Sequence, residues 1–244
     1  MVEKHVELLV FAAHPDDAEL ACGGTLSAFV HGGGKAAIVD LTSGERASRG
    51  NAELRRQEAE AAARVLGVSR LFLELPDTAL AASSKEQRAA VVKTLRAFRP
   101  SFVLLPHPDD PHPDHREASA LVQAAAFLAG VRGFSPEVGD PHRPWLLLAY
   151  PGPRQVGEPT VVVEVTAFYQ QKREALSCYR SQFAPGEGPP TQLASGFFLE
   201  AIEGRDRAFG NLIGVPLAEG FFALGPLSAK ALQAFLKGVL CASA

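Results

Sequence analysis

The stretch Val6-Glu7-Leu8-Leu9-Val10-Phe11-Ala12-Ala13-His14-Pro15-Asp16-Asp17 decides the fold, because an apolar run ends there in a cluster of imidazole and carboxylate side chains. Such a run is typical of a strand buried on both faces, as in a parallel sheet. The pattern recurs later in the chain, where the apolar run Phe102–Pro106 is followed by His112-Pro113-Asp114-His115. Imidazoles and carboxylates gathered at strand ends indicate a bound divalent metal and hydrolytic chemistry.

Outward from these clusters, short apolar runs alternate with helical patterns. This alternation predicts a Rossmann-like, doubly wound α/β fold, with a mostly parallel sheet flanked by helices. The second half is less regular and contains a Pro/Gly-rich, lid-like loop at Ala184–Pro190. We therefore expect a C-terminal elaboration of a single domain over residues 1–244. The predicted strands are Val6–Ala13, Ala36–Leu41, Arg70–Leu73, Phe102–Pro106 and Thr160–Val165, and the predicted helices are Cys22–His31, Ala52–Leu66, Ser84–Phe98, Pro113–Leu128, Ala167–Tyr179, Phe197–Leu212 and Ser228–Val239.

The composition is that of an ordinary globular protein. Of 244 residues, 47% are hydrophobic and 21% charged, and the formal net charge is −3. This balance gives no electrostatic reason to expect nucleic acid or an anionic membrane as a partner. Cys22, Cys178 and Cys241 are widely spaced and odd in number, which fits a reducing compartment rather than a disulfide framework. The first apolar run is too short for a signal sequence, and no segment is long enough to span a membrane. We expect a cytoplasmic protein.

The polar clusters all follow predicted strands. His14–Asp17 follows the first strand, Thr42–Glu45 the second, Pro76-Asp77 the third and His107–His115 the fourth. In open α/β sheets, ligands bind outside the carboxyl ends of the strands. All of these candidate functional residues therefore lie at one edge of the predicted sheet.

The first cluster has the spacing of metal ligands. Hydrolytic zinc sites commonly use three protein ligands and leave a position for water. His14 and Asp17 can face one cation where the chain turns into a helix, and Asp16 would then point toward the water. A third ligand would be His112 or His115, and spacing alone leaves that choice open. A single such residue is more often a helix cap or a solvated loop residue, but two clusters at corresponding strand ends are hard to explain as caps.

At these residues the chain resembles the LmbE-like, or PIG-L, family of zinc-dependent N-acetylglucosaminyl deacetylases. Ala13–Asp17 is similar to the family's first signature, (A/P)HPDD, and His112–His115 is similar to its second, HPDH. Leu41–Glu45 resembles the T-x-GE segment, and Arg55-x-x-Glu58 resembles the R-x-x-E helix. Tyr179–Gln182 looks like the Y-x-SQ segment of the bacillithiol-pathway branch. The resemblance covers most of the chain.

The resemblance implies a role for each side chain in the two clusters. One zinc ion per chain would be bound by His14, Asp17 and His115, and Fe²⁺ is an alternative metal for such a set. Asp16 would act as general base on the attacking water. The other two residues are His112, which would stabilise the oxyanion, and Asp114, which would orient His112. The proton for the leaving amine would come from Asp16 or His112.

Substrate contacts rest mainly on the resemblance. Arg55 matches an arginine that faces the family's substrate pocket, although without the family it could equally pair with Glu58 on a solvated helix face. Glu45 could cap a turn or contact the sugar, and we favour the sugar. Ser181 and Gln182 are expected to contact substrate, although they could merely end a helix.

The implied reaction removes acetyl from an N-acetylglucosaminyl glycoside, with GlcNAc-malate in bacillithiol synthesis as the first candidate. Two departures affect the choice of glycoside. Pro111 stands where many members of that branch have arginine, and Ala208-Phe209 stands where relatives often have tyrosine. The alternatives are another N-acetyl sugar, a thiol–sugar conjugate, or a sugar- or nucleotide-binding module without catalysis. The resemblance also implies a homo-oligomer, often a hexamer.

Overall fold

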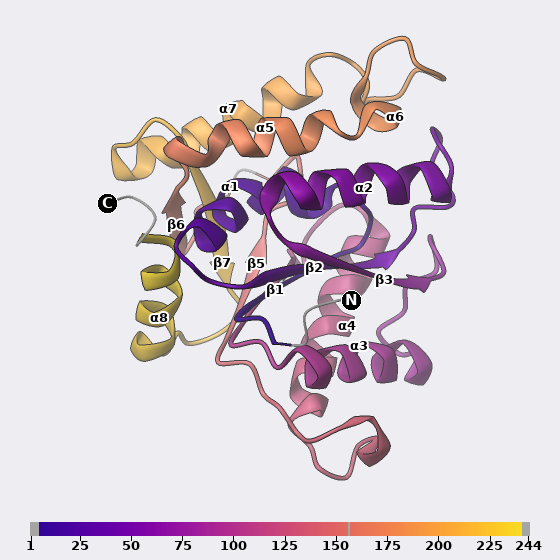
Figure 1. Ribbon diagram of the computed structural model, residues 1–244, viewed down its shortest axis with the longest axis vertical. Helices are drawn as coiled ribbons and strands as arrows, with labels where there is room; N and C mark the ends of the chain where they lie inside the picture. Colours follow the sequence, from indigo (N-terminus) through magenta and orange to yellow (C-terminus); the bar gives the residue numbers. More distant parts are fainter. Residues whose placement is uncertain (1–4, 156, 241–244) are drawn as a thin grey trace.

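The computed structural model describes residues 5–155 and 157–240, and its centre is a sheet with helices on both faces (Figure 1). The seven strands of this sheet lie in the order β3-β2-β1-β4-β5-β7-β6. Their bounds are β1 Leu8–Ala12, β2 Ala36–Thr42, β3 Ser69–Leu75, β4 Phe102–Pro106, β5 Leu146–Tyr150, β6 Val161–Glu164 and β7 Ala218–Ala223.

The first five strands are parallel, and the chain reverses its direction of travel across the sheet between β1 and β4. This is the switch point at which doubly wound sheets bind ligands. β7 runs antiparallel to both β5 and β6, and β6 and β7 form the C-terminal extension of the sheet. The predicted fold class is confirmed. β5 and β7 are both absent from the predicted strands, and in β7 the apolar pattern is interrupted by Glu219 and Gly220.

The helices form two layers. α1, α2 and α8 pack on one face of the sheet, with α5 lying over α1 and α2, and α3 and α4 pack on the other face. Successive residues of β1 therefore enter opposite cores: Leu8 and Val10 lie in one, and Leu9 and Phe11 in the other. The bounds are α1 Asp17–His31, α2 Ala52–Leu66, α3 Lys85–Phe98, α4 Pro113–Ala129, α5 Tyr169–Ser177, α6 Arg180–Phe183, α7 Phe198–Ile213 and α8 Ala229–Leu240, with short 3₁₀ turns at Pro136–Val138 and Thr166–Phe168.

Helix ends follow local signals where these exist. Asn51 caps α2 by accepting a hydrogen bond from the Leu54 N–H at 2.9 Å, and Gly67 ends the helix with a φ of 72°. α1 begins at Asp17 rather than at the predicted Cys22, and Cys22 instead marks a break in it, with φ −142° and ψ 22°. The sequence pattern thus locates the second part of α1 and misses its first turn.

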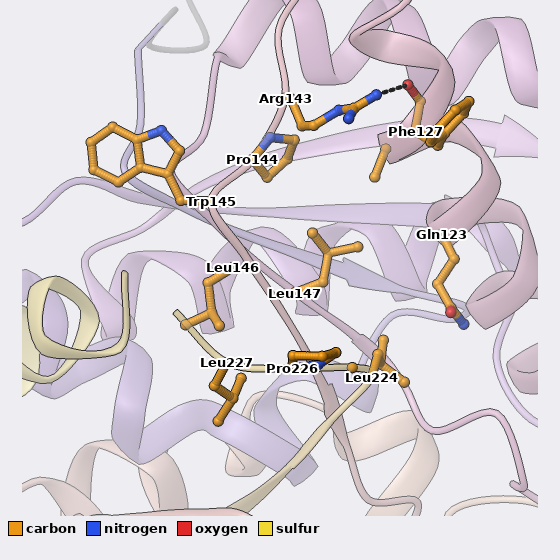
Figure 2. Close-up of a pocket in the computed structure, with 12 residues that line it drawn as sticks. Gln123, Phe127, Arg143, Pro144, Trp145, Leu146, Leu147, Leu224, Pro226 and Leu227 are labelled. Carbon is orange, nitrogen blue, oxygen red and sulfur yellow. Dashed lines mark hydrogen bonds between the residues drawn. The ribbon is translucent and has the colours of Figure 1, made fainter. Parts of the chain in front are cut away.

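None of the described helices is long and apolar enough to cross a membrane. Cys22 and Cys178 are free thiols, and Cys241 lies outside the described residues. An apolar groove lies beside the amino end of β5, where Phe127 and Trp145 are each 62% exposed (Figure 2). This groove is remote from the polar clusters, which follow the carboxyl ends of the strands.

Candidate metal centre

The switch point between β1 and β4 brings the two histidine clusters together. His14 follows β1 closely, Asp17 is the first residue of α1, and His115 lies in the first turn of α4. A tight turn pairs the first two, because the Asp17 N–H donates to the His14 carbonyl at 3.3 Å and the His14 N–H donates to Asp17 Oδ2 at 2.9 Å. Sequence-distant groups thus meet at one edge of the sheet, as predicted from strand alternation.

The donor atoms have the spacing of a small metal site. Asp17 Oδ2 lies 3.5 Å from His14 Nδ1 and 3.3 Å from His115 Nε2. Zinc bonds of about 2.0–2.2 Å in a tetrahedron require donor–donor distances of about 3.3–3.6 Å. His112 is close as well, since one ring nitrogen each from His14, His112 and His115 lie within 4.8 Å of one another. The imidazoles of His14, His112 and His115, with Asp17 beside two of them, could together hold a divalent metal ion.

Further carboxylates contact the opposite nitrogens of the two histidines. His14 Nε2 lies 3.2 Å from Asp77 Oδ1 and 3.3 Å from Asp114 Oδ2, and His115 Nδ1 lies 3.1 Å from Asp110 Oδ2. Metal-binding histidines commonly have such a carboxylate partner, which fixes the ring and its tautomer. The group His14, Asp77 and Asp114 also has ligand atoms within 4.8 Å of one another. We assign it to orienting His14, because Asp114 Oδ2 already accepts the Thr78 N–H at 2.8 Å.

Asp77 and Asp110 are not among the predicted site residues. The sequence pattern places both at the correct sheet edge, Asp77 after the third predicted strand and Asp110 within His107–His115, without assigning either a role. The available signal is their position after β3 and β4, at the edge where the ligands meet.

The carboxylates around the histidines favour positive charge in the metal-free protein. Burial opposes the charged form of His14, but hydrogen bonds with Asp114, Asp17 and Asp77 raise its pKa well above the ordinary value. Burial likewise opposes charge on His115, yet Asp17 and Asp110 raise its pKa to about 9. Metal ligation requires neutral imidazole, so a metal ion binding here would displace protons.

Asp16 lies beside the ligand set in a distinct environment. Its backbone adopts a φ of 112°, an uncommon conformation for a residue with a side chain, which is often found at functional sites. Burial raises the pKa of its carboxyl group to about 7, against the opposing effect of the Arg55 charge. Arg55 Nη2 donates to Asp16 Oδ2 at 3.1 Å. A carboxyl group that titrates near neutral pH is suited to general base catalysis.

Contrary to the expectation from the resemblance, Arg55 does not face an open pocket. It is 4% exposed, and its guanidinium donates to Asp16 and to the carbonyls of Pro15 and Gly44. The alternative pairing with Glu58 is not formed either, because the Glu58 carboxylate accepts hydrogen bonds from Ser181. In the structure, Arg55 positions the Asp16 carboxylate.

His112 and Asp114 also differ from expectation. The Asp114 carboxylate contacts His14 rather than His112. His112 Nδ1 instead accepts the backbone N–H of Asp114 at 3.2 Å, as the N-cap of α4. Burial and the neighbouring charges of His115 and His14 lower the pKa of His112. Because Nδ1 accepts this hydrogen bond, Nε2 is the ring nitrogen left to donate to another group.

The predicted sugar contacts lie away from the donor atoms. Glu45 is exposed, and its Oε1 accepts the Asp77 N–H at 2.7 Å. Ser181 Oγ donates to Glu58, and Gln182 Nε2 donates to the Arg49 carbonyl at 2.9 Å. Ser181 and Gln182 are buried and bind other parts of the protein, so the structure does not place them as open substrate contacts.

Comparisons with known proteins identify relatives of the chain and of its fold. The family model described as PIG-L, GlcNAc-PI de-N-acetylase, matches residues 9–126. Diacetylchitobiose deacetylase from Thermococcus kodakarensis is 31% identical, covering 72% of this chain and 70% of that protein. A probable N-acetyl-α-D-glucosaminyl L-malate deacetylase 2 from Bacillus anthracis is also 31% identical, covering 75% and 83%. A 4-oxalmesaconate hydratase from Pseudomonas putida is 29% identical, covering 71% and 73%.

A solved structure extends the similarity to the whole fold. The conserved protein TT1542 from Thermus thermophilus is 40% identical and matches with a TM-score of 0.81, covering 91% of this chain and 96% of that one. The match therefore includes both halves of the sheet, and both histidine clusters lie within the region of the family model. From this agreement in sequence and in fold, we conclude that the chain belongs to the PIG-L, or LmbE-like, family of deacetylases.

Proposed function

We propose that this protein is a metal-dependent deacetylase that removes the acetyl group of an N-acetylglucosaminyl glycoside, releasing acetate and a free amino sugar. The observation that carries the proposal is the position of Asp16, a buried carboxyl group held by Arg55 directly beside the donor set of Asp17, His14 and His115. A site for binding alone would not need this additional acid.

His14, Asp17 and His115 would hold the ion, which we propose to be one Zn²⁺ per chain, with Fe²⁺ as the alternative. When bound, such an ion lowers the pKa of water and polarises the amide carbonyl. The outer carboxylates of Asp77, Asp114 and Asp110 keep the two imidazoles aimed at it.

Asp16 and His112 would perform the proton and charge chemistry. Asp16 takes a proton from the attacking water, and Arg55 holds the carboxylate in place. The Nε2–H of His112 donates to the carbonyl oxygen as negative charge develops on it, a contribution on the order of 3 kcal/mol for one such donor. Asp16, once protonated, or His112 then supplies the proton that the departing amine needs.

For the glycoside, we propose GlcNAc-malate as the first candidate, because one similar protein is named as a deacetylase of that compound. Diacetylchitobiose is the second candidate, because another similar protein is named for it. Against GlcNAc-malate stands Pro111, directly before the second histidine cluster, because proline carries no positive charge to bind a malate carboxylate.

Acetate release by the purified protein tests the proposal. The panel comprises GlcNAc-malate, diacetylchitobiose, free GlcNAc and an N-acetylated thiol–sugar conjugate, each with and without chelator, and hydration of 4-oxalmesaconate is followed in parallel. We expect chelator-sensitive acetate release from at least one glycoside. Stoichiometric metal with no acetate release from any sugar would support a binding module, and hydratase activity alone would replace the proposed reaction.

A further inference from the structure

The break in α1 is held open by two charged side chains from the C-terminal half. In a regular α-helix, the Leu20 carbonyl and the Gly24 N–H would pair with each other. Here the Gly24 N–H donates to Glu219 Oε1 at 3.0 Å, and the Thr25 N–H donates to Glu219 Oε2 at 2.7 Å. The Leu20 carbonyl accepts a hydrogen bond from Arg205 Nη2 at 2.7 Å. Each of these backbone groups therefore has a partner outside the helix, as buried backbone requires.

Arg205 and Glu219 belong to a buried, electrically balanced cluster. Lys172 Nζ lies 2.6 Å from Asp206 Oδ2 and 2.7 Å from Glu219 Oε1, and Arg205 Nη2 lies 3.0 Å from Asp206 Oδ1. In this cluster two cations face two carboxylates, and all four residues are buried. Buried charges persist only when they are paired and hydrogen-bonded, so the cluster has little freedom to rearrange.

One arm of Arg205 reaches the part of α1 that carries Asp17. Its partner is the Leu20 carbonyl, and the Leu20 N–H in turn donates to the Asp16 carbonyl at 2.9 Å. Hydrogen bonds of Leu20 thus hold the first turn of α1 at both ends, to Arg205 on one side and to the Asp16 carbonyl on the other.

The other arm of Arg205 reaches the side of the centre that carries His115. Arg205 Nη1 donates to the Gly152 carbonyl at 3.3 Å. Gly152 packs so closely on Asp110 that a Cβ there would overlap Asp110 Oδ2, the atom that faces His115 Nδ1. A shift of Gly152 would therefore move Asp110, and with it the ring of His115.

We propose that Arg205 is a positioning residue that sets the separation of Asp17 and His115, because one guanidinium ties the first turn of α1 to the Gly152 backbone behind Asp110. This inference rests on the proposed metal centre and adds a determinant of its affinity that touches neither metal nor substrate. A guanidinium is suited to this role because its rigid fork can donate to two carbonyls at once.

The test is the affinity for Zn²⁺ of Arg205→Met and Arg205→Lys, measured by competition with a chromophoric chelator, with thermal unfolding of each metal-free protein measured in parallel. The matched control is Arg96→Met. Arg96 is also buried, 4% exposed, and also holds backbone carbonyls, but these belong to Ala129, Val131 and Ser135, at the end of α4 and in the segment after it.

We expect Arg205→Met to bind Zn²⁺ about tenfold more weakly, the low end of the range for residues behind metal ligands. Arg205→Lys should recover part of the lost affinity, because lysine keeps the positive charge. The recovery should be incomplete, because a single ammonium group cannot donate to both carbonyls. Arg96→Met should lower the unfolding temperature and keep the wild-type affinity.

Wild-type Zn²⁺ affinity in folded Arg205→Met would overturn the inference, and so would an equal loss of affinity in Arg96→Met. If Arg205→Met does not fold, Arg205→Lys against Arg96→Lys decides in the same way. A wild-type protein that binds Zn²⁺, with altered affinity in the Arg205 variants, but releases no acetate would refute the proposed reaction and leave the positioning role intact. A wild-type protein that binds no Zn²⁺ would refute both.

Discussion

Replacement of Lys172 by methionine measures how much the buried charge cluster contributes to the free energy of unfolding. Lys172 is fully buried and contacts Asp206 at 2.6 Å and Glu219 at 2.7 Å. Removing one partner of a buried ion pair costs about 3–5 kcal/mol, because the remaining charge stays buried without compensation. Both carboxylates keep other donors, which are Tyr169 and Arg205 for Asp206 and the backbone at the α1 break for Glu219. We therefore expect a loss of about 3 kcal/mol, at the low end of this range.

Thermal unfolding of the metal-free protein, followed by circular dichroism or calorimetry, measures this loss. For a chain of this size, about 1 kcal/mol corresponds to about 2–4 °C, so the midpoint should fall by about 6–12 °C. The control is Lys93→Met, which removes an exposed lysine of α3 and should change the free energy of unfolding by no more than about 0.5 kcal/mol. A Lys172→Met variant that loses less than about 1 kcal/mol would show that the cluster is not the coupled unit described above.

Three further predictions concern the metal centre. Asp16→Ala should retain bound metal by elemental analysis and lose about two to four decades of turnover, and near-full turnover would remove Asp16 from the mechanism. Asp17→Ala should instead reduce the metal content of the purified protein, and full occupancy would contradict its role as ligand. Arg55→Met removes the charge that opposes the raised pKa of Asp16, so the acid limb of the kcat/KM profile should move to higher pH by about one to three units, whereas Arg56→Met, at a partly exposed neighbour, should leave it in place.

The first half of the fold could be predicted because its signals are local. β1 and β4 are continuous apolar runs, and α2 has boundary residues of its own, Asn51 and Gly67. The meeting of His14–Asp17 with His107–His115 followed from the rule that the carboxyl ends of parallel strands lie at one edge, whereas the choice of His115 over His112 came from the family resemblance. No knowledge of side-chain contacts was needed for that step.

The second half was harder because its stabilising contacts are not local. Glu219 makes β7 a poor strand by pattern, yet its carboxylate binds backbone groups of α1 that lie almost the length of the chain away. Whether Asp114 orients His112 or His14 depends on rotamers that no spacing rule contains. Arg55 matched a family position, but its burial against Asp16 could only be seen in three dimensions.

The break in α1 is the point where the second half of the chain supports the metal centre of the first half. All the proposed ligands lie between residues 14 and 115, whereas Lys172, Arg205 and Glu219, which brace the helix that carries Asp17, come from the second half. Exchange of a second-half loop should therefore preserve the metal centre only where residue 152 remains glycine and the buried brace is unchanged.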